Sequence, residues 1–314
     1  MRADGACRRP GRVVAVVVTW QRLDLLRQAL AGVLGQDRPP DAVVVVDNAS
    51  TDGTASVVAA EHPEVDLLVL RRNTGGAGGF AAGLQRALER HDADHVWLLD
   101  DDTVPTPGAL GALLDAWAGL RGDPPALVAS RVVWHDGREH PMNTPRRSPL
   151  VGPAGRAAAA DIGCEPVRSA SFVSVLIDAE AVRAVGLPLA DYFLWNDDFE
   201  YTTRLLRGRA GLRCPASTVT HLTRTFGASD ADPGPRFYYE VRNKVWLFTR
   251  SPGLGPVERL LYGGSSLLRW GRTVRRSRNR RVLGGAAARG LRDGLRGGPR
   301  SNDEVLADAL PDGG

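Results

Sequence analysis

Two groups of adjacent carboxylates are the side chains of this 314-residue chain best suited to chemistry. The first group is Asp100, Asp101 and Asp102, which directly follow the apolar segment HVWLL. Two unit charges about 4 Å apart repel by roughly 4 kcal/mol at an effective dielectric constant of 20, so such a group commonly has a counter-cation. Alternate residues of an extended chain point the same way, so Asp100 and Asp102 could share one divalent cation. A solvated acidic turn before the next helix is the alternative interpretation.

The second group is Asp197 and Asp198, in the segment WNDDFE. The neighbouring Trp195 and Phe199 could shield a carboxylate from water, which raises its pKa toward that of a working general base. Acids that stabilise a helix N-terminus through the macrodipole are the alternative. His221, which closes a short strand-like segment, is either a structural hydrogen-bonding residue or a further ligand of a metal that two aspartates hold. Imidazole suits Mn²⁺ better than Mg²⁺.

A glycine-rich segment, NTGGAGG, begins at Asn73. The spacing Gly76-x-Gly78-x-x-Ala81, with Asp100 about 20 residues further on, fits the dinucleotide-binding pattern and favours an NAD(P)-dependent oxidoreductase as one hypothesis. Two observations argue against that hypothesis: the segment follows the third expected strand instead of the first, and the acidic triplet suits a metal. Close approach of the backbone to a sugar or pyrophosphate, and tight packing of a helix on a strand, are the other two interpretations.

Apolar runs alternate with helix-like segments in the first hundred residues. We expect strands at residues 12–18, 42–46, 65–70 and 95–99, with helices at 23–34, 54–60 (capped by Thr54) and 80–90. This alternation predicts an α/β fold with a doubly wound, mostly parallel sheet. Ligands bind beyond the carboxyl ends of such strands, where Asp47, the glycine segment and the acidic triplet all lie. The pattern weakens after residue 118, where we expect strands at 126–134, 171–177 and 217–220 and a helix at 178–185. Further apolar-polar segments cover residues 194–207 and 236–250, and WNDDFE in the first of them looks like the start of a helix.

The composition excludes several classes of protein. Apolar residues make up 43% and charged residues 24%, as in ordinary globular chains and unlike disordered ones. The longest apolar run falls far short of the ~18 residues that span a bilayer. No apolar h-region follows the charged N-terminus, so we expect no cleaved secretory signal. Cys7, Cys164 and Cys214 are widely separated, which argues against a disulfide scaffold or a cysteine-rich zinc site and favours a reducing cytosol.

Positive charge is concentrated at the C-terminal end. From residue 251 onward there are twelve arginines against six acids, a balance of +6, whereas the first 250 residues carry a balance of −2. Apolar side chains are interleaved with these arginines: Trp270, Val282, Leu283, Leu291 and Leu295. This mixture favours a segment drawn to an anionic membrane surface, at about 1 kcal/mol per arginine. A flexible solvated tail and a nucleic-acid-binding segment are the alternatives, and we expect no nucleic-acid partner.

Several segments taken in order are similar to a known family: VAVVVTWQR, VVVVDNASTDGT, RRNTGGAGGFAAGL, WLLDDDTVP, FLWNDDFEYTTR and a histidine ahead of FYYEVRN. Over about residues 12–250 the chain resembles family 2 glycosyltransferases, above all bacterial rhamnosyl- and galactofuranosyltransferases that build cell-wall polysaccharide. The resemblance implies a GT-A fold, with a nucleotide-sugar-binding half (12–118) and an acceptor half (119–250). A short tail (1–11) precedes it, and a basic, partly helical or flexible region (251–314) follows.

The resemblance also implies an activity, namely inverting, Mn²⁺- or Mg²⁺-dependent transfer from a dTDP- or UDP-sugar to a hydroxyl of a lipid-linked acceptor. We expect a cytoplasmic enzyme at the inner face of the plasma membrane. A further alternative is a protein that binds nucleotide-sugars without catalysis. Such a protein would keep the first half of the chain but would not need Asp198.

Site residues carry over by position. Asp198 would be the catalytic base, with Asp197 as the second choice, and Trp195 would form part of the acceptor wall. Asp100 and Asp102 would form the metal-binding D-x-D motif, and His221 would complete the metal site. Because the residue between them is also an aspartate, Asp101 could take the place of Asp102 as the second aspartate ligand. The nucleotide-sugar would be bound by seven residues, of which the first two would contact the base and ribose: Thr19, Asp47, Asn73, Gly75, Gly76, Asp100 and Asp101.

Overall fold

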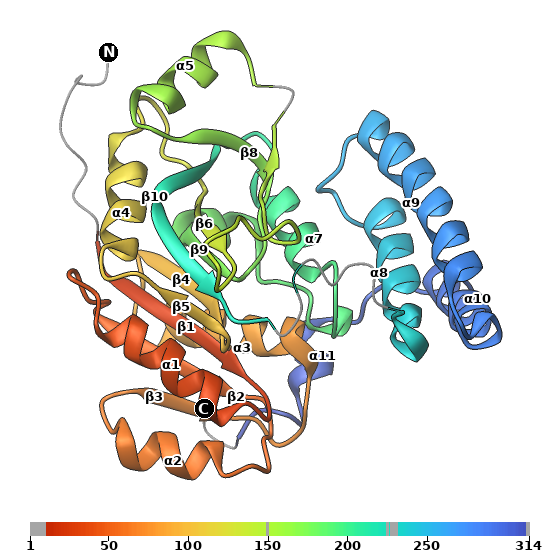
Figure 1. Ribbon diagram of the computed structural model, residues 1–314, viewed down its shortest axis with the longest axis horizontal. Helices are drawn as coiled ribbons and strands as arrows, with labels where there is room; N and C mark the ends of the chain where they lie inside the picture. The colour runs from red at the N-terminus through yellow and green to blue at the C-terminus, as the bar shows by residue number, and fades with distance from the viewer. Residues whose placement is uncertain (1–10, 149–150, 224–225, 227–231, 312–314) are drawn as a thin grey trace.

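The computed structural model describes residues 11–148, 151–223, 226 and 232–311 (Figure 1). The expected N-terminal tail, apart from Gly11 and including Cys7, lies outside the described residues. The centre of the fold is a ten-stranded mixed sheet with the order β3-β2-β1-β4-β9-β6-β10-β8-β7, in which β5 also pairs with β10. Cys164 and Cys214 are both buried, and neither forms a disulfide.

The first half of the sheet is parallel. The helices that connect its strands are α1 (Leu23–Leu34), α2 (Thr54–Glu61) and α3 (Gly75–Glu89). Its strands are β1 (Val13–Thr19), β2 (Ala42–Asp47), β3 (Asp66–Val69) and β4 (His95–Asp100). β1 lies between β2 and β4 and pairs in parallel with both. The expected doubly wound α/β arrangement is confirmed.

The sequence of β1 shows why this sheet is covered on both faces. Successive side chains of a strand point to opposite faces, so a strand in the middle layer must be apolar throughout. Val14 and Val16 belong to one buried apolar cluster, together with Phe80 and Leu84 of α3. Val13 and Val17 belong to a second cluster on the other face, which includes these residues of α1 and of α4 (Ala109–Gly119): Leu26, Leu30, Leu110 and Leu113.

The second half of the sheet mixes strand directions. β9 (Ser174–Asp178) lies antiparallel between β4 and β6 (Leu127–Val133). β10 (Gly211–His221) runs parallel to β6 and antiparallel to β5 (Thr103–Pro105). The remaining elements of this half are β7 (Arg146–Arg147), β8 (Glu165–Ser169), α4 (Ala109–Gly119), α5 (Pro153–Asp161), α6 (Ala179–Val185), the 3-10 helix η1 (Ala190–Tyr192) and α7 (Asp197–Leu205).

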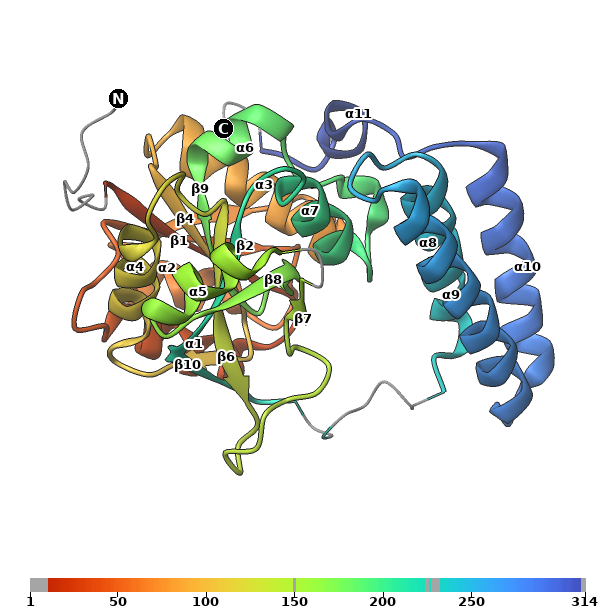
Figure 2. The ribbon, with the colours of Figure 1, turned by 90° about the horizontal axis from the view of Figure 1, so that it is seen from above.

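Three long helices stand beside the sheet, as Figures 1 and 2 show in cyan to blue: α8 (Phe237–Thr249), α9 (Pro256–Arg276) and α10 (Arg280–Arg296). They follow the short 3-10 helix η3 (Gly234–Arg236). The chain then returns to the sheet through α11 (Asn302–Leu306), whose Val305 and Leu306 join the same cluster as α3. None of the helices in the described part of the chain is long and apolar enough to cross a bilayer.

Two local expectations were wrong. Helix α3 begins at Gly75 instead of residue 80, because packing outweighs the low helix propensity of glycine. A Cβ atom on Gly79 would lie 2.5 Å from Val18 Cγ1, so glycine lets α3 approach β1 closely. The Gly76-x-Gly78-x-x-Ala81 pattern therefore lies inside a helix. Gly79 allows the tight packing of a helix on a strand, which was one interpretation of the glycine-rich segment. Thr54 does not cap α2, since it is the first residue of that helix and Gly53 precedes it.

Candidate active site

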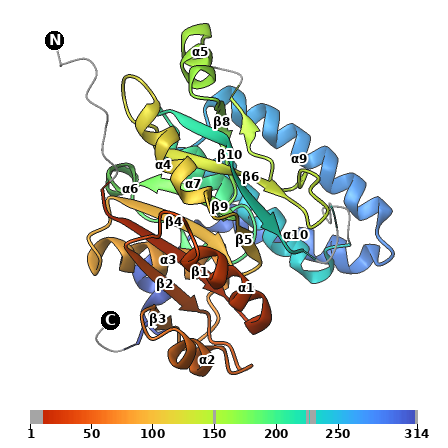
Figure 3. The same ribbon diagram turned by 60° about the vertical axis from the view of Figure 1, so that its left-hand side comes forward.

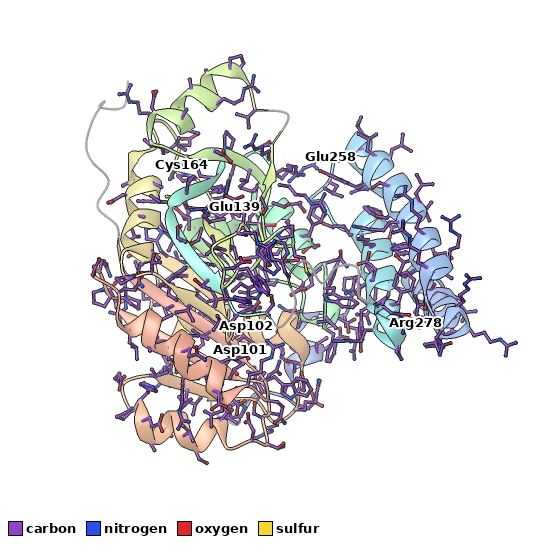
Figure 4. The ribbon with its side chains drawn as sticks, in the orientation of Figure 1. Asp101, Asp102, Glu139, Cys164, Glu258 and Arg278 are labelled. Atoms are coloured by element: carbon purple, nitrogen blue, oxygen red, sulfur yellow. The ribbon has the colours of Figure 1, made fainter. Side chains whose placement is uncertain are left out.

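The acidic triplet lies where β4 ends. Asp100 is the last residue of β4, and the chain turns through Asp101 and Asp102 into β5 (Figure 4 labels the last two aspartates). Pairing of β5 with β10 places His221 opposite Thr103, next to Asp102. The His221 Nε2 atom lies 2.9 Å from Asp102 Oδ1. Ligand atoms of Asp100, Asp102 and His221 all lie within 4.8 Å of one another, so three donors, one of them from a segment distant in sequence, converge on one point.

The charges of this cluster suit a cation. Burial, together with the nearby charges of Asp102 and Asp101, raises the pKa of Asp100 to about 8. Burial also acts to raise the pKa of Asp102, but the hydrogen bond and charge of His221 outweigh it and lower that pKa. The same pairing raises the pKa of His221 against the opposing effect of burial. Two carboxylates and an imidazole form a donor set that fits Mn²⁺, whose charge would offset the repulsion between the aspartates.

Asp101 points to different partners. Its carboxylate accepts hydrogen bonds from Thr19 Oγ1 at 2.9 Å, from the Trp20 backbone N–H at 3.3 Å and from Arg22 Nη1 at 3.0 Å. Arg22 also donates to Asp102 Oδ2 at 2.9 Å. Asp101 therefore ties the end of β1 to the acidic turn and stands outside the group of three donors. Arg22 is a site residue that the sequence interpretation missed, although it belongs to the segment VAVVVTWQR.

The expected donor-binding residues gather around the end of β2. Asp47 is fully buried, and its Oδ1 accepts the Ser50 backbone N–H at 3.0 Å. Its Oδ2 has no hydrogen-bond partner among the described residues, so this buried acceptor is left unsatisfied. Asn48, whose role the sequence interpretation missed, donates from Nδ2 to the Gly75 carbonyl at 2.7 Å and accepts the Thr74 backbone N–H at 2.7 Å. The glycine segment is thereby held against the end of β2.

The start of α3 contacts the loop that precedes α7. Asn73 Oδ1 accepts the Gly75 backbone N–H at 2.7 Å. Gly75 has a φ of +73°, and a Cβ atom there would overlap the Phe193 carbonyl. The Ala77 backbone N–H donates to the same carbonyl at 3.3 Å. A Cβ atom on Gly76 would have no atom within 4 Å, so Gly76 faces open space beside this contact.

The loop that carries the second acidic pair has an unusual backbone. Phe193, Trp195 and Asn196 have φ values of 62°, 65° and 65°, in the left-handed region that costs a non-glycine residue about 1–3 kcal/mol. Helix α8 holds the loop in place through Asn243, which is fully buried. Its Nδ2 atom donates to three carbonyls: Tyr192 at 2.9 Å, Leu194 at 2.9 Å and Trp195 at 2.8 Å. Asn243 belongs to FYYEVRN, but its role depends on a contact that the sequence pattern does not predict.

Asp197 and Asp198 begin α7, as the sequence predicts. Burial, reinforced by the charge of Asp198, raises the pKa of Asp197 to about 7. Burial raises the pKa of Asp198 to about 6, even though its carboxylate accepts the Phe199 backbone N–H at 2.7 Å and Arg146 lies nearby. A carboxylate that changes its charge near neutral pH has the property that general-base catalysis requires.

One loop joins the two acidic groups. Asn143 Oδ1 lies 2.9 Å from His221 Nδ1. Three residues later, the Arg146 guanidinium lies 5.4 Å from the centre of the Phe199 ring, beside Asp198. An extended chain covers at most about 3.5 Å per residue, so the backbones at these two points of the loop are no more than about 11 Å apart. The segment from Asn143 to Arg146 therefore contacts both the cluster of Asp100, Asp102 and His221 and the start of α7.

Comparison with known proteins identifies the family. The family model "Glycosyltransferase like family 2" matches residues 10–231. The chain is 30% identical over 276 residues to galactofuranosyltransferase GlfT1 of Mycolicibacterium smegmatis, covering 80% of this chain and 88% of that protein. It is 28% identical to N-acetylglucosaminyl-diphospho-decaprenol L-rhamnosyltransferase of Mycobacterium tuberculosis, over 66% of this chain and 74% of that protein.

The fold is also similar to a solved structure, mannosyltransferase PcManGT from Pyrobaculum calidifontis in complex with GDP-Man and Mn²⁺. The TM-score is 0.53 at 20% identity, covering 97% of this chain and 81% of that one. These similarities confirm the expected GT-A fold and favour a transferase over the oxidoreductase hypothesis. The chain belongs to glycosyltransferase family 2.

Proposed function

We propose that this glycosyltransferase is metal-dependent and inverting, and that it transfers a sugar from a UDP- or dTDP-linked donor to a hydroxyl of a lipid-linked glycan. The observation that carries the proposal is the convergence of Asp100, Asp102 and His221 on one point, together with the segment from Asn143 to Arg146 that contacts both this cluster and the start of α7. A lipid-linked acceptor is supported by the decaprenol-linked substrate in the name of the rhamnosyltransferase relative, and Mn²⁺ by the solved mannosyltransferase complex.

The metal site would consist of Asp100, Asp102 and His221, a donor set that fits Mn²⁺ or Mg²⁺. A bound divalent cation supplies positive charge that stabilises a diphosphate leaving group. The Asp47 Oδ2 atom, which has no partner in the described part of the chain, would accept a hydrogen bond from the nucleoside, with Thr19 beside it. Asn73, Gly75 and Gly76 would line the donor, and Asp101 would keep the end of β1 in position through its hydrogen bonds to Thr19 and Trp20.

Asp198 would act as the catalytic base, with Asp197 as the second choice. As the acceptor oxygen forms a bond to the anomeric carbon, its proton passes to the Asp198 carboxylate. The bond from the anomeric carbon to the diphosphate oxygen breaks on the opposite face, and the nucleoside diphosphate leaves with the electron pair. One displacement of this kind inverts the anomeric configuration. Trp195, which the loop before α7 holds beside the base, would form part of the acceptor wall.

The experiment that tests this proposal compares Asp198→Asn with the matched variant Asp197→Asn. We expect Asp198→Asn to lower the rate of sugar transfer by roughly a thousandfold, because proton transfer by a positioned base contributes 10²–10⁴-fold. Donor binding, measured by calorimetry, should stay within about threefold of the wild type, a difference below about 1 kcal/mol. Turnover retained by Asp198→Asn and lost by Asp197→Asn would assign the base to Asp197. A product with the anomeric configuration of the donor, detected by NMR, would refute inversion.

A further inference from the structure

Helix α9 carries its exposed apolar side chains on one side. Five of them define what we call the leucine face, with exposed fractions between 64% and 77%: Val257, Leu260, Leu261, Leu267 and Leu268. At about 100° per residue, these positions fall within an arc roughly 120° wide. Tyr262, Ser266 and Trp270 lie on the opposite side, and all three are less exposed. The apolar stripe of α9 therefore points away from the protein, the reverse of an ordinary surface helix.

Positive charge borders the leucine face. Arg272, Arg275 and Arg276 occupy the last turns of α9, and Arg280 and Arg281 begin α10; all five are exposed. The acid of α9, Glu258, is engaged by Arg168, whose Nε and Nη2 atoms donate to it at 2.6 and 3.0 Å. Exposed leucines beside arginines are the composition of helices that lie in the interface of an anionic membrane.

The other side of α9 contacts the elements that hold the proposed base. The Tyr262 ring lies 5.7 Å from the ring of Phe199, the neighbour of Asp198. Trp270 Nε1 donates to Glu240 Oε1 at 3.2 Å, and Glu240 Oε2 accepts from Asn196 Nδ2 at 2.9 Å. Figure 3 shows α9 along one edge of the molecule. A surface that covered the leucine face would thus lie one helix away from Asp198.

We propose that the leucine face of α9 is a docking surface for an anionic lipid bilayer. The leucines enter the boundary between headgroups and acyl chains, and the arginines at the end of the helix pair with lipid phosphates. We favour a bilayer over a second copy of the chain, because lipid phosphates complement the arginines, whereas the acid that α9 of a second copy would offer, Glu258, is already paired with Arg168. The docking surface differs from the one expected from sequence, since Leu283 is fully buried against α8 and Trp270 faces the protein. Of the other expected residues, Leu291 and Leu295 of α10 are exposed.

Docking would bring a lipid-linked acceptor close to Asp198, and this role rests on the proposed function. Lipid binding itself requires neither a donor nor sugar transfer, so it can be tested separately. The test is co-sedimentation of the full chain with phosphatidylcholine vesicles that contain about 30% phosphatidylglycerol, at low salt. We expect binding that weakens in about 0.5 M salt and on pure phosphatidylcholine. The double variant Leu260→Ser/Leu268→Ser should lose roughly tenfold or more in affinity, since each leucine contributes apolar area to the bound state.

A matched control replaces two exposed apolar residues elsewhere, Val69→Ser and Met142→Ser, and should bind vesicles like the wild type. Circular dichroism and thermal unfolding establish that each variant is folded. The proposal would be overturned if the wild type did not bind anionic vesicles, or if the double variant bound them as well as the wild type. A wild type that forms a dimer and does not bind vesicles, with the dimer lost in the double variant, would show that the leucine face binds a second copy instead. Transfer to a soluble acceptor, measured in parallel, should be unchanged in the double variant. A wild type that binds vesicles but transfers no sugar would count against the proposed activity and not against docking.

Discussion

Replacement of Asn243 by alanine tests how helix α8 controls the loop before α7, which leads to the proposed base. The Nδ2 atom carries two hydrogens, so it makes at most two full hydrogen bonds at once to the carbonyls of Tyr192, Leu194 and Trp195. Each bond contributes about 0.5–1.5 kcal/mol, and a buried carbonyl left without a partner costs about 1–3 kcal/mol. We therefore expect Asn243→Ala to lower the free energy of unfolding by about 2–4 kcal/mol.

The effect on catalysis follows from the backbone of the loop. Without Asn243, the residues with positive φ can relax toward more common conformations, which moves the start of α7 and Asp198. A displacement of about 1 Å can cost roughly a hundredfold in rate, so kcat should fall by about that factor while calorimetric donor affinity changes little.

Asn302→Ala is the matched control for this prediction. Asn302 Nδ2 donates to the Pro188 carbonyl at 2.8 Å and its Oδ1 accepts the Ala190 backbone N–H at 2.9 Å, so its loss removes similar hydrogen bonds before the loop. This variant should lower stability measured by urea unfolding yet keep kcat within about threefold of the wild type, a difference of less than about 1 kcal/mol. Equal kcat values for Asn243→Ala and the wild type, at a clearly reduced stability of the variant, would refute the positioning role.

Three further predictions follow from the site. A base must be ionised, and the pKa of Asp198 is raised to about 6, so kcat/KM should fall roughly tenfold per pH unit below pH 6 and level off above it. A flat profile of kcat/KM from about pH 5 to 8 would contradict this. Gly75→Ala should destabilise the protein by at least about 1–3 kcal/mol, because residue 75 has a positive φ and the added Cβ atom would overlap the Phe193 carbonyl. Gly76→Ala should not destabilise the protein, and equal urea midpoints for the two variants would contradict this. Asp47→Asn should weaken UDP or dTDP binding roughly tenfold in calorimetry, and unchanged affinity would remove Asp47 from the nucleotide site.

The parallel half of the fold could be predicted from sequence because its signals are local. The continuous valine run of β1 needs burial on both faces, and the acidic triplet directly follows the apolar residues of β4. A strand that is apolar up to its last residues and then turns acidic must end at the edge of the sheet. The sequence pattern alone therefore predicts that Asp100, Asp101 and Asp102 lie at the carboxyl edge, where the fold has them.

Contacts between distant segments could not be predicted in the same way. His221 reaches Asp102 only because β5 pairs antiparallel with β10, and the register of that pairing has no local signature. Arg22 and Asn243 lie in the segments VAVVVTWQR and FYYEVRN, but no role was assigned to them from sequence, although one binds the acidic turn and the other holds the loop before α7. Their roles become visible only when the partners of each buried polar group are known.

The most direct test of the proposed cation site is a calorimetric titration of UDP and dTDP with and without Mn²⁺. In the wild type, we predict at least about tenfold tighter nucleotide binding with Mn²⁺, a coupling of roughly 1.4 kcal/mol. Asp102→Ala should abolish this difference, whereas the isosteric control Asp101→Asn should retain it, since Asp101 bonds to Thr19 and Arg22 outside the three donors. Equal affinities with and without Mn²⁺ in the wild type would contradict a cation held by Asp100, Asp102 and His221.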